Sequence, residues 1–388
     1  MNKTFGALVQ EGVLEFSDGY RTRKDQLADE GFRILRVSDV HDGWIGRDGQ
    51  DFVARDLADR IGQKFAREGD LLLTTKGTIG RVAVVPDLRD EALVYSPQLC
   101  YFRVRDEAAL DSKYLRYWFS SSRARQQIRA LSSSTDMAPY LSLRDIRAMS
   151  ISLPDLAVQR RIGEVLGALD DKIAANRRAA ALSYGLMDAI VGASEKVDVP
   201  LFDAFSFTFG GAFKGEHFSE PGVGRPLIRI RDLKSQRCQI WTTEALPKEQ
   251  LAEPGALLVG MDAEFRPTMW TGDSGLVNQR VMSVTSEKYG PAVSRVALSD
   301  PLLRIERSKV ATTVIHLNKS DLHLESAAVP SEEELGRIRA AVDPLYSRCV
   351  AASVESDLLA STRDELLPLL MSGRITVTDA ERAAGDVL

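Results

Sequence analysis

The sequence has few cysteines and no long apolar run. Its three cysteines, Cys100, Cys238 and Cys349, lie far apart along 388 residues. An odd number of cysteines at such spacing argues against a disulfide framework and indicates a reducing compartment. No apolar run approaches the ~18 residues of a membrane span, and the opening residues MNKTFGALVQEG lack the apolar stretch of a signal peptide. We therefore expect a cytoplasmic protein.

The chain also lacks the residue patterns of common catalytic sites. Its four histidines are scattered, and no His or Cys spacing matches a zinc template. No Ser, His or Cys constellation at a readable spacing supports nucleophilic catalysis. The Asn-Pro-Pro-aromatic sequence of adenine methylation is missing, and no nuclease carboxylate cluster stands out. We expect no catalytic residue, no metal and no cofactor bound by this chain.

The composition is that of a folded globular protein. Hydrophobic residues make up 44% and charged residues 27%, with a net charge of −5. The length predicts two or three domains at roughly 150 residues each. The negative net charge is weak evidence against a basic coat for nucleic acid, but the local distribution of charge decides binding. Residues 112–135 hold five basic residues and no acidic one, which fits either a solvated helix face or a binding surface.

An internal repeat organises the chain. The matching segments keep their order while their offset falls from 193 to 176, as expected if the second copy has shorter loops. They are ILRVSDV (34–40) with LIRIRDL (227–233), GDLLLT (69–74) with GALLVG (255–260), SPQL (96–99) with VNQR (277–280), and LSLRDIRAMSISLPD (141–155) with LNKSDLHLESAAVPS (317–331).

Each copy starts with a β-rich part and ends with a long helix. Short apolar runs such as FRILRV and RVMSVT, separated by Gly, Asp and Pro, are typical of short strands with tight turns. In the first copy, residues 113–131 predict a further helix after the strands. The fold class is therefore α+β, with two β-rich domains separated by two long helices.

The long helices carry apolar residues at alternating spacings of four and three, which predicts a coiled-coil seam. Polar groups in this seam either lie near its wet ends or set the register. Pro344 is expected to kink or delay the second helix. The seam positions are Ile162, Leu166, Leu169, Ile173, Asn176, Ala180, Ser183, Met187 and Ile190, and then Ile338, Val342, Leu345, Cys349, Ala352, Ser356, Leu359, Arg363 and Leu366.

These patterns predict five parts of the chain: residues 1–152 and 195–329 as the β-rich domains, 153–194 and 330–372 as the helices, and 373–388 as a tail. A helix of about 28 residues at ~1.5 Å per residue is roughly 42 Å long. That length is close to one turn of B-DNA, about 34–36 Å. Two similar but non-identical domains at a fixed spacing would recognise a split, asymmetric site.

The segment GDLLLTTKGTIG (69–80) raises the question of a nucleotide site. A P-loop needs Lys followed by Ser or Thr after its last glycine, at the start of a helix. Here Arg81 follows Gly80, and the strand-like VAVV comes next. The segment therefore predicts a hairpin between two strands.

The chain resembles the specificity subunits of type I restriction–modification systems over nearly its whole length. The resemblance is carried by GDLLLTTKGTIGRVAVVP (69–86), YSPQLCYFRV (95–104), the run at 141–173, ELLPLLMSGRITV (365–377) and, in the second copy, GALLVGMDAEFRPTMWTGDSGLVNQRV (255–281). The second helix departs from the pattern, because PSEEELGRIRAAV stands where the first copy has PDLAVQRRIGEVL.

The resemblance implies a non-catalytic subunit of a phage-defence complex. Each β-rich domain is then a target-recognition domain that reads one half of a bipartite site in double-stranded DNA, and the two helices form an antiparallel coiled coil that sets the spacer. Two modification (methyltransferase) subunits dock on the helices, and restriction (translocase-nuclease) subunits join them. S-adenosylmethionine and ATP are then cofactors of those partners. The alternatives are a specificity subunit of a related methylation-based phage-defence system and a coiled-coil scaffold without a DNA function.

Candidate DNA contacts in the first domain lie in the hairpin and in nearby polar or basic loops. Glycines let backbone N–H groups approach phosphates, a lysine supplies charge, and Gln suits bidentate contact with adenine. The plain alternatives are an exposed turn lysine, a strand-edge hydrogen bond from Gln98, a helix cap in the Ser loop and solvated basic loops. The candidates are Lys76, Thr78, Arg81, Ser96, Gln98, Ser133, Ser134, Arg21, Arg23 and Lys24.

The second domain has carboxylates in the corresponding loop. An acidic residue near DNA is costly unless it accepts a hydrogen bond from a cytosine amino group, and Asp262 alternatively orients Arg266. The candidates there are Lys214, Arg229, Arg231, Asp262, Glu264, Arg266, Asn278, Gln279 and Arg280.

Overall fold

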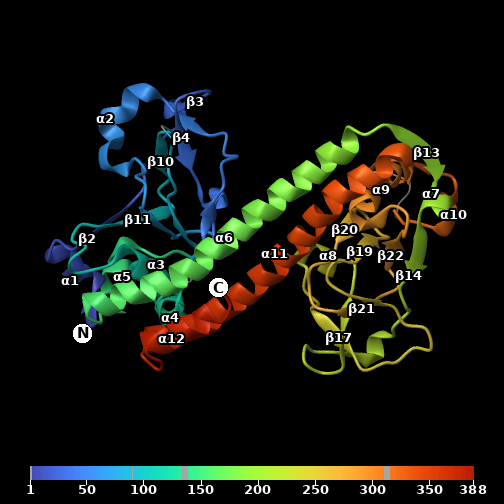
Figure 1. Cartoon of the computed structure of the whole chain (residues 1–388). Coiled ribbons are helices and arrows are strands. Elements are labelled where there is room, and N and C mark those ends of the chain that lie inside the picture. The colour runs from blue at the N-terminus through green and yellow to red at the C-terminus, as the bar shows by residue number, and fades with distance from the viewer. Residues whose placement is uncertain (1, 90, 133–138, 310–314) are drawn as a thin grey trace. The chain divides into compact units, whose positions relative to one another are not determined.

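The computed structural model describes residues 2–89, 91–132, 139–309 and 315–388 (Figure 1). The chain divides into two compact units. The first contains the chain up to Asp171 together with Ala360–Leu388, and the second contains Lys172–Leu359. The boundary falls inside both long helices, α6 (Leu156–Gly192) and α11 (Glu332–Ser372). Each unit therefore combines one β-rich part with a part of each helix.

The first unit contains two four-stranded sheets. One is antiparallel with the order β2-β11-β8-β9, and the other has the order β10-β4-β7-β3 with β10 and β4 parallel. Two small pairs, β1 with β12 and β5 with β6, complete it. Its strands are β1 (Asn2–Thr4), β2 (Leu14–Asp18), β3 (Leu27–Ala28), β4 (Phe32–Leu35), β5 (Val40–His41), β6 (Trp44–Ile45), β7 (Phe52–Val53), β8 (Leu71–Thr74), β9 (Val82–Val84), β10 (Leu93–Tyr95), β11 (Leu99–Val104) and β12 (Ser150–Ser152). Its further helices are α1 (Phe5–Gln10), α2 (Ala58–Ile61), α3 (Ser112–Ser120), α4 (Ser122–Leu131), α5 (Leu143–Ala148) and α12 (Val377–Gly385).

The second unit repeats this plan with a four-stranded antiparallel sheet, β14-β22-β19-β20, and a five-stranded sheet, β15-β17-β16-β21-β18. The pair β13 and β23 corresponds to β1 and β12. The strands are β13 (Lys196–Pro200), β14 (Ser206–Phe209), β15 (Phe218–Ser219), β16 (Arg225–Ile228), β17 (Ile240–Thr242), β18 (Leu251–Ala252), β19 (Leu257–Gly260), β20 (Pro267–Met269), β21 (Gly275–Val277), β22 (Val281–Thr285) and β23 (Ser326–Pro330). The helices are α7 (Leu201–Ala204), α8 (Asp232–Ser235), α9 (Gly290–Lys309) and α10 (Lys319–His323).

The topology confirms the predicted internal repeat and the α+β class. The antiparallel sheets match strand by strand, and the parallel pair β10 with β4 matches β21 with β16. Even a helix start is repeated. Ser142 and Asp145 form a capping box at α5, and Asn318 and Asp321 form one at α10. These boxes satisfy the free N–H groups of the first helical turn in both copies.

The helix predicted over residues 113–131 is interrupted. Ser121 ends α3, since its N–H donates to the carbonyl of Trp118 (3.0 Å), and its Oγ accepts from the N–H of Ala124 at the start of α4 (3.3 Å). A serine that caps the next helix favours such a break, because its side chain competes for backbone groups. Within the same basic stretch, Arg116 bonds to Asp170 (2.8 Å) and is therefore structural, whereas Arg123, Arg125 and Arg129 are exposed.

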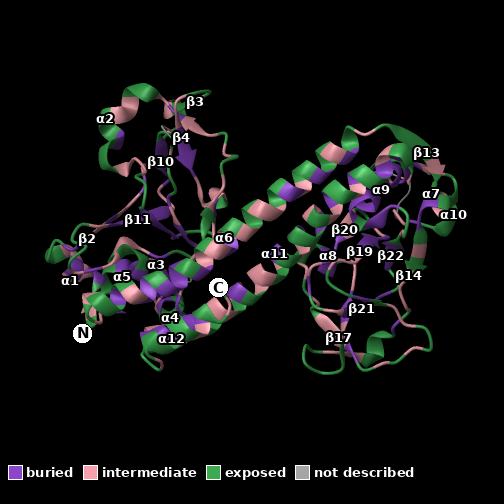
Figure 2. Cartoon of the chain, viewed as in Figure 1, coloured by how far each residue is buried: buried purple, intermediate pink, exposed green. Residues whose placement is uncertain are grey.

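The long helices pair in an antiparallel sense within each unit, which confirms the predicted coiled coil. In the second unit, Lys172 of α6 pairs with Glu355 of α11 (3.3 Å), and Cys349 Sγ lies 3.5 Å from the Ala180 carbonyl oxygen. Residue numbers therefore rise along one helix as they fall along the other. Figure 2 shows buried and exposed residues alternating along both helices. Of the predicted seam positions, the buried ones are Ile162, Leu166, Leu169, Ile173, Ser183, Met187, Ile338, Val342, Cys349, Ala352, Leu359 and Leu366.

Two details of the second helix differ from the sequence prediction. Helix α11 begins at Glu332 and continues through Pro344, so the expected delay is wrong. Leu345 is only half-buried, and the neighbouring Tyr346 is buried instead, with its hydroxyl donating to the Gly255 carbonyl (3.0 Å). The packing of the helix against the β-rich part therefore shifts the buried position by one residue.

The polar seam positions make specific contacts. The Asn176 amide donates to Glu355 (2.7 Å), and Arg363 Nη1 donates to Asp170 Oδ1 (2.7 Å). The same Asp170 carboxylate accepts from Arg116 (2.8 Å) and from the hydroxyl of Tyr117 (2.7 Å). Burial and the Asp170 charge raise the pKa of Tyr117, so its hydroxyl remains a donor. One carboxylate thus joins α3, α6 and α11 within the first unit.

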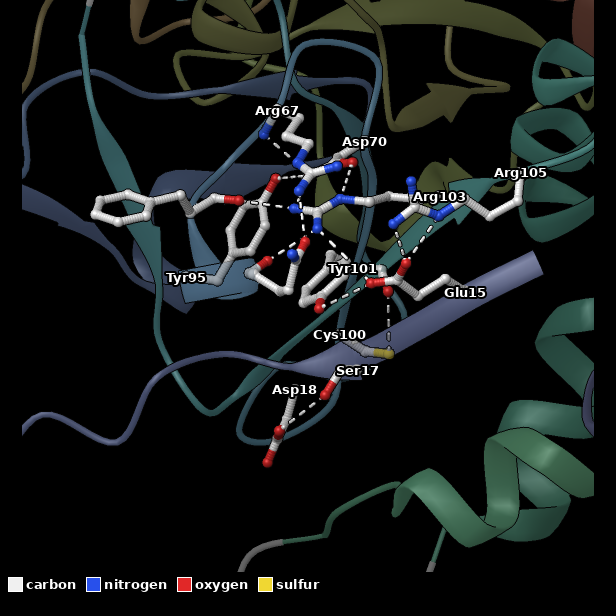
Figure 3. Close-up of polar contacts among 12 residues, drawn as sticks. Glu15, Ser17, Asp18, Arg67, Asp70, Tyr95, Cys100, Tyr101, Arg103 and Arg105 are labelled. Atoms are coloured by element: carbon white, nitrogen blue, oxygen red, sulfur yellow. Dashed lines mark hydrogen bonds and ion pairs between the residues drawn. The ribbon is translucent and has the colours of Figure 1, made fainter. Parts of the chain in front are cut away.

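A buried carboxylate, that of Asp70, supports the hairpin of the first unit (Figure 3). Arg103 holds Asp70 through two hydrogen bonds, Nε to Oδ1 (2.7 Å) and Nη2 to Oδ2 (2.9 Å). The Tyr95 hydroxyl donates to the same carboxylate (2.6 Å), and burial together with the Asp70 charge raises the pKa of Tyr95. Asp70 directly precedes β8, so this cluster fixes the start of the strand that leads into residues 75–81. The second unit has Ala256 at the place of Asp70.

We predict that Asp170→Asn lowers the free energy of unfolding by about 2 kcal/mol, because an amide cannot accept charge-assisted hydrogen bonds from two arginines and a tyrosine. Asp171→Asn is the matched control: Asp171 is the exposed neighbour, and its change is expected to stay within about 0.5 kcal/mol. Urea unfolding of the full chain measures both. Equal effects of the two substitutions would contradict the role of Asp170.

We predict a larger loss, about 3 kcal/mol, for Asp70→Asn, because the buried Arg103 loses the ionised carboxylate that accepts two of its hydrogen bonds. Asp18 offers a comparison, since its ion pair with Lys64 (2.8 Å) is partly exposed, and Asp18→Asn is expected to cost less than about 1 kcal/mol. The unfolding midpoints in urea decide the order. If Asp18→Asn costs as much as Asp70→Asn, the buried cluster is not what holds β8.

Candidate nucleic-acid interface

The segment GDLLLTTKGTIG forms a hairpin, as predicted. Strands β8 and β9 are antiparallel, with Leu71 opposite Val84 and Leu73 opposite Val82. The backbone N–H of Gly80 closes the turn on the Thr74 carbonyl (3.0 Å), with a φ of 94° that favours glycine. The second unit has the same arrangement in β19 and β20. The chain beyond the turn is a strand in both units, so neither turn is a P-loop.

Two adjoining cavities of the first unit gather most of its predicted DNA contacts. They have volumes of about 280 and 560 Å³ and share Arg36, Lys76 and Gln98 in their linings. Arg23 lies in the same loop as Arg21 but does not line them, and Ser133 and Ser134 fall outside the described residues. The predicted residues in the linings are Arg21, Lys24, Lys76, Thr78, Arg81, Ser96 and Gln98.

The linings of the two cavities contain five cations and no carboxylate. Arg36 pairs with Asp51, and Arg81 donates to the Val40 carbonyl (3.2 Å). Within the described part of the chain, the cationic groups of Arg21, Lys24 and Lys76 have no hydrogen-bond or ion-pair partner. Unpaired cations in a concave surface create a positive potential that attracts phosphates, whatever the net charge of the whole protein.

Ser96 and Gln98 place neutral polar groups among these cations. The Gln98 carbonyl accepts from the Thr75 N–H (2.9 Å) and from its hydroxyl (2.9 Å). Its side-chain amide makes no hydrogen bond to any described residue, so the strand-edge alternative applies to the backbone of Gln98 and not to its side chain. Ser96 is 1% exposed, and its Oγ lacks a partner in the described structure.

The backbone hydrogen bonds around Ser96 recur in the second unit, but the residues that make them are one position away from those that the sequence alignment predicts. The Ser96 N–H donates to the Leu35 carbonyl (3.0 Å), and the Asn278 N–H donates to the Ile228 carbonyl (3.0 Å). Ser96 therefore corresponds to Asn278, and the predicted match of SPQL with residues 277–280 is wrong by one position.

The counterpart of Gln98 is thus Arg280. The Met261 N–H donates to the Arg280 carbonyl (3.0 Å), as the Thr75 N–H does to that of Gln98. Asp262 forms an isolated β-bridge with His316, and Lys76 forms one with Tyr140. A carboxylate in the second unit therefore stands where the first unit has Lys76, as the sequence predicts.

Asp262 does not orient Arg266, so that alternative is wrong. Its Oδ1 lies 2.6 Å from His316 Nδ1 and 3.6 Å from Arg280 Nη1. Arg266 instead pairs with Glu306 (2.6 Å). Burial raises the pKa of Glu306, but the hydrogen bonds from Arg266 and from the Phe265 N–H outweigh it and hold that pKa below its usual value.

The remaining candidates of the second unit have mixed surroundings. Arg229 is held by the buried Asp232, with its N–H 3.0 Å and its Nε 3.3 Å from Oδ2, which makes it structural. Asn278 is 9% exposed, and its Oδ1 accepts from the Gln279 N–H (2.8 Å). The exposed side chains are those of Lys214, Arg231, Glu264, Gln279 and Arg280.

Three residues of these sites were not predicted from the sequence. Arg36 lines both cavities. In the internal repeat, Arg36 of ILRVSDV aligns with Arg229 of LIRIRDL, which was itself a candidate. That repeat was a usable signal. Tyr140 and His316 reach the sites through β-bridges to Lys76 and Asp262. Their pairing with distant segments leaves no local pattern.

No helix in the described part of the chain is both long and apolar enough to span a membrane. Residues 5–181 match the family described as "Type I restriction modification DNA specificity domain". The match covers the β-rich part of the first unit and continues into α6.

Two curated relatives are similar to this chain. The specificity subunit of the type I restriction enzyme EcoBI from Escherichia coli is 29% identical over 182 residues, which are 45% of this chain and 38% of that protein. The specificity subunit of the type I restriction enzyme MjaVIII from Methanocaldococcus jannaschii is 23% identical over 170 residues, or 43% of this chain and 39% of that protein. The similar stretch thus spans about two fifths of each relative.

A crystal structure of the S subunit of a type I restriction-modification system from M. genitalium has the same fold. It is similar over 95% of this chain and 95% of its own, with a TM-score of 0.61 at 14% sequence identity. The likeness in fold therefore extends beyond residues 5–181 to both units.

Proposed function

Because residues 5–181 match the family described as type I restriction modification DNA specificity domain, we propose that this chain is the DNA-recognition subunit of a type I restriction–modification complex. Each unit recognises one half of a bipartite sequence in double-stranded DNA. The helices α6 and α11 set the number of unread base pairs between the halves.

The observation that carries this proposal is the pair of cationic cavities in the first unit. Lys76, Arg21 and Lys24 supply unpaired positive charge, and the free amide of Gln98 lies among them. Phosphate contacts fix the position of a protein on DNA, and contacts to base edges specify the sequence. A site that combines both kinds of group, and whose lining has no carboxylate, suits duplex DNA better than a neutral ligand.

The different chemistry of the two units supports an asymmetric target. The same backbone positions hold Lys76 and Gln98 in one unit and Asp262 and Arg280 in the other. Identical units would read the same half-site twice, whereas these units present different groups.

The partners follow from this role. Modification (methyltransferase) subunits dock on the helices and use S-adenosylmethionine, and restriction (translocase-nuclease) subunits use ATP. The chain itself binds neither cofactor, catalyses no step and acts in the cytoplasm. The names of the two relatives, both specificity subunits of type I restriction enzymes, support this assignment.

The test is DNA binding by the full chain in complex with its modification subunits, measured by gel shift and fluorescence anisotropy over a salt titration. We expect sequence-preferring binding by the wild-type complex. Lys76→Ala is expected to weaken binding about equally on all sequences and to reduce the slope of log K against log salt by about 1.

Lys3→Ala is the control, because it removes the same charge from the first unit outside the cavities, where Lys3 pairs with Glu11 (2.6 Å). It is expected to leave affinity and salt slope unchanged. Absence of DNA binding by the wild-type complex would overturn the proposed function. An equal effect of the two substitutions would overturn the role of the cavities.

A further inference from the structure

The two units offer one backbone position at which their base-reading side chains can be compared directly. This position follows the parallel strand, β10 in the first unit and β21 in the second. Its carbonyl accepts from the residue just before the hairpin turn, Thr75 for Gln98 (2.9 Å) and Met261 for Arg280 (3.0 Å). The two side chains therefore leave the backbone from equivalent places.

The neighbouring residue in the hairpin turn also differs between the units: it is the cationic Lys76 in the first and the anionic Asp262 in the second. In the first unit the neutral Gln98 shares its cavities with Lys76. In the second unit the cationic Arg280 lies within 3.6 Å of the Asp262 carboxylate. The first unit thus pairs a cation, Lys76, with a neutral amide. The second pairs a carboxylate, Asp262, with a cation, so neither unit places like charges together.

Asp262 and His316 hold only one end of the Arg280 guanidinium. Nη1 lies 3.4 Å from His316 Nε2 and 3.6 Å from Asp262 Oδ1, while His316 Nδ1 donates to that carboxylate (2.6 Å). Nε and Nη2 make no hydrogen bond to any described residue, and the side chain is 52% exposed. The free edge carries two parallel N–H donors, which is the geometry of a bidentate contact.

The chemistry of the two side chains distinguishes two bases. Gln pairs in a bidentate manner with N6 and N7 of adenine, and Arg pairs with O6 and N7 of guanine, both in the major groove. Resting on the proposed function, we propose that this single backbone position is a base-reading position in each unit, with Gln98 selecting adenine in the first half-site and Arg280 selecting guanine in the second.

Asp262 and His316 are positioning residues in this account. They restrict the guanidinium to one orientation and leave its Nε–Nη2 edge free. Asp262 offers its carboxylate to Arg280 and His316, not to a base. The loop of the second unit thus tolerates a carboxylate near DNA, because that carboxylate is already paired with a cation.

The experiment selects DNA from a randomised duplex library with the complex of the full chain and its modification subunits, and compares the base preferences of variants. Gln98→Ala is expected to lower the preference for adenine at one position of the first half-site by about tenfold or more. Arg280→Ala is expected to do the same for guanine at one position of the second half-site. In each case the other half-site keeps its preferences.

Asp262→Asn is expected to lower discrimination at the same guanine position while affinity for other sequences stays within about twofold, because the arginine remains but loses its orientation.

Arg304→Ala and Gln50→Ala are the controls. Arg304 is nearly as exposed as Arg280, 53% against 52%, and pairs with Glu325, not with Asp262 or His316. Gln50 is exposed in the first unit. Neither control is expected to change any base preference.

The outcomes separate this inference from the proposed function. A wild-type complex without sequence preference overturns the proposed function itself. A sequence preference that Arg280→Ala or Gln98→Ala leaves unchanged overturns the inference alone, as does loss of the guanine preference in Gln279→Ala but not in Arg280→Ala. A uniform loss of affinity in Asp262→Asn, with discrimination intact, overturns the positioning role.

Discussion

In both units, a glycine that follows the first strand of the antiparallel sheet packs so closely against the backbone at the end of the parallel strand that no side chain fits there. A Cβ on Gly19 would lie 2.1 Å from the Tyr95 carbonyl oxygen, and a Cβ on Gly210 would lie 2.3 Å from that of Asn278. Glycine alone permits this approach. This contact fixes the end of the parallel strand against the antiparallel sheet, and the backbone position of Gln98 and Arg280 and the hairpin turn both depend on that junction. The frame is therefore a backbone property, shared by two units whose side chains differ.

Because the backbone sets the frame, its side chains are free to carry different chemistry. In the first unit, Lys76 adds an unpaired cation and Gln98 a free amide. In the second unit, Asp262 takes the place of Lys76 and pairs with Arg280. The buried support differs as well, since Asp70 has no charged counterpart in the second unit. A duplicated scaffold with exchanged contact residues is what two readers of unlike half-sites require.

Sequence reasoning predicted the features that leave a local or periodic pattern. The hairpin of residues 69–86, the order of repeated strands and the two long helices follow from apolar runs, turn residues and heptad spacing. The features that depend on contacts between distant segments could not be predicted in this way. The register of Asn278 is set by a hydrogen bond to the Ile228 carbonyl, His316 reaches Asp262 from a distant segment, and Pro344 is accommodated because tertiary packing outweighs the loss of one helical hydrogen bond.

The central claim is that one chain reads two different DNA sequences at a fixed spacing. Methylome sequencing of cells that express this chain with its modification subunits tests the claim most directly. The account predicts methylation at a bipartite, non-palindromic motif whose two halves are separated by a constant number of unspecified bases. A continuous motif, a palindromic one, or methylation that does not depend on this chain would contradict it.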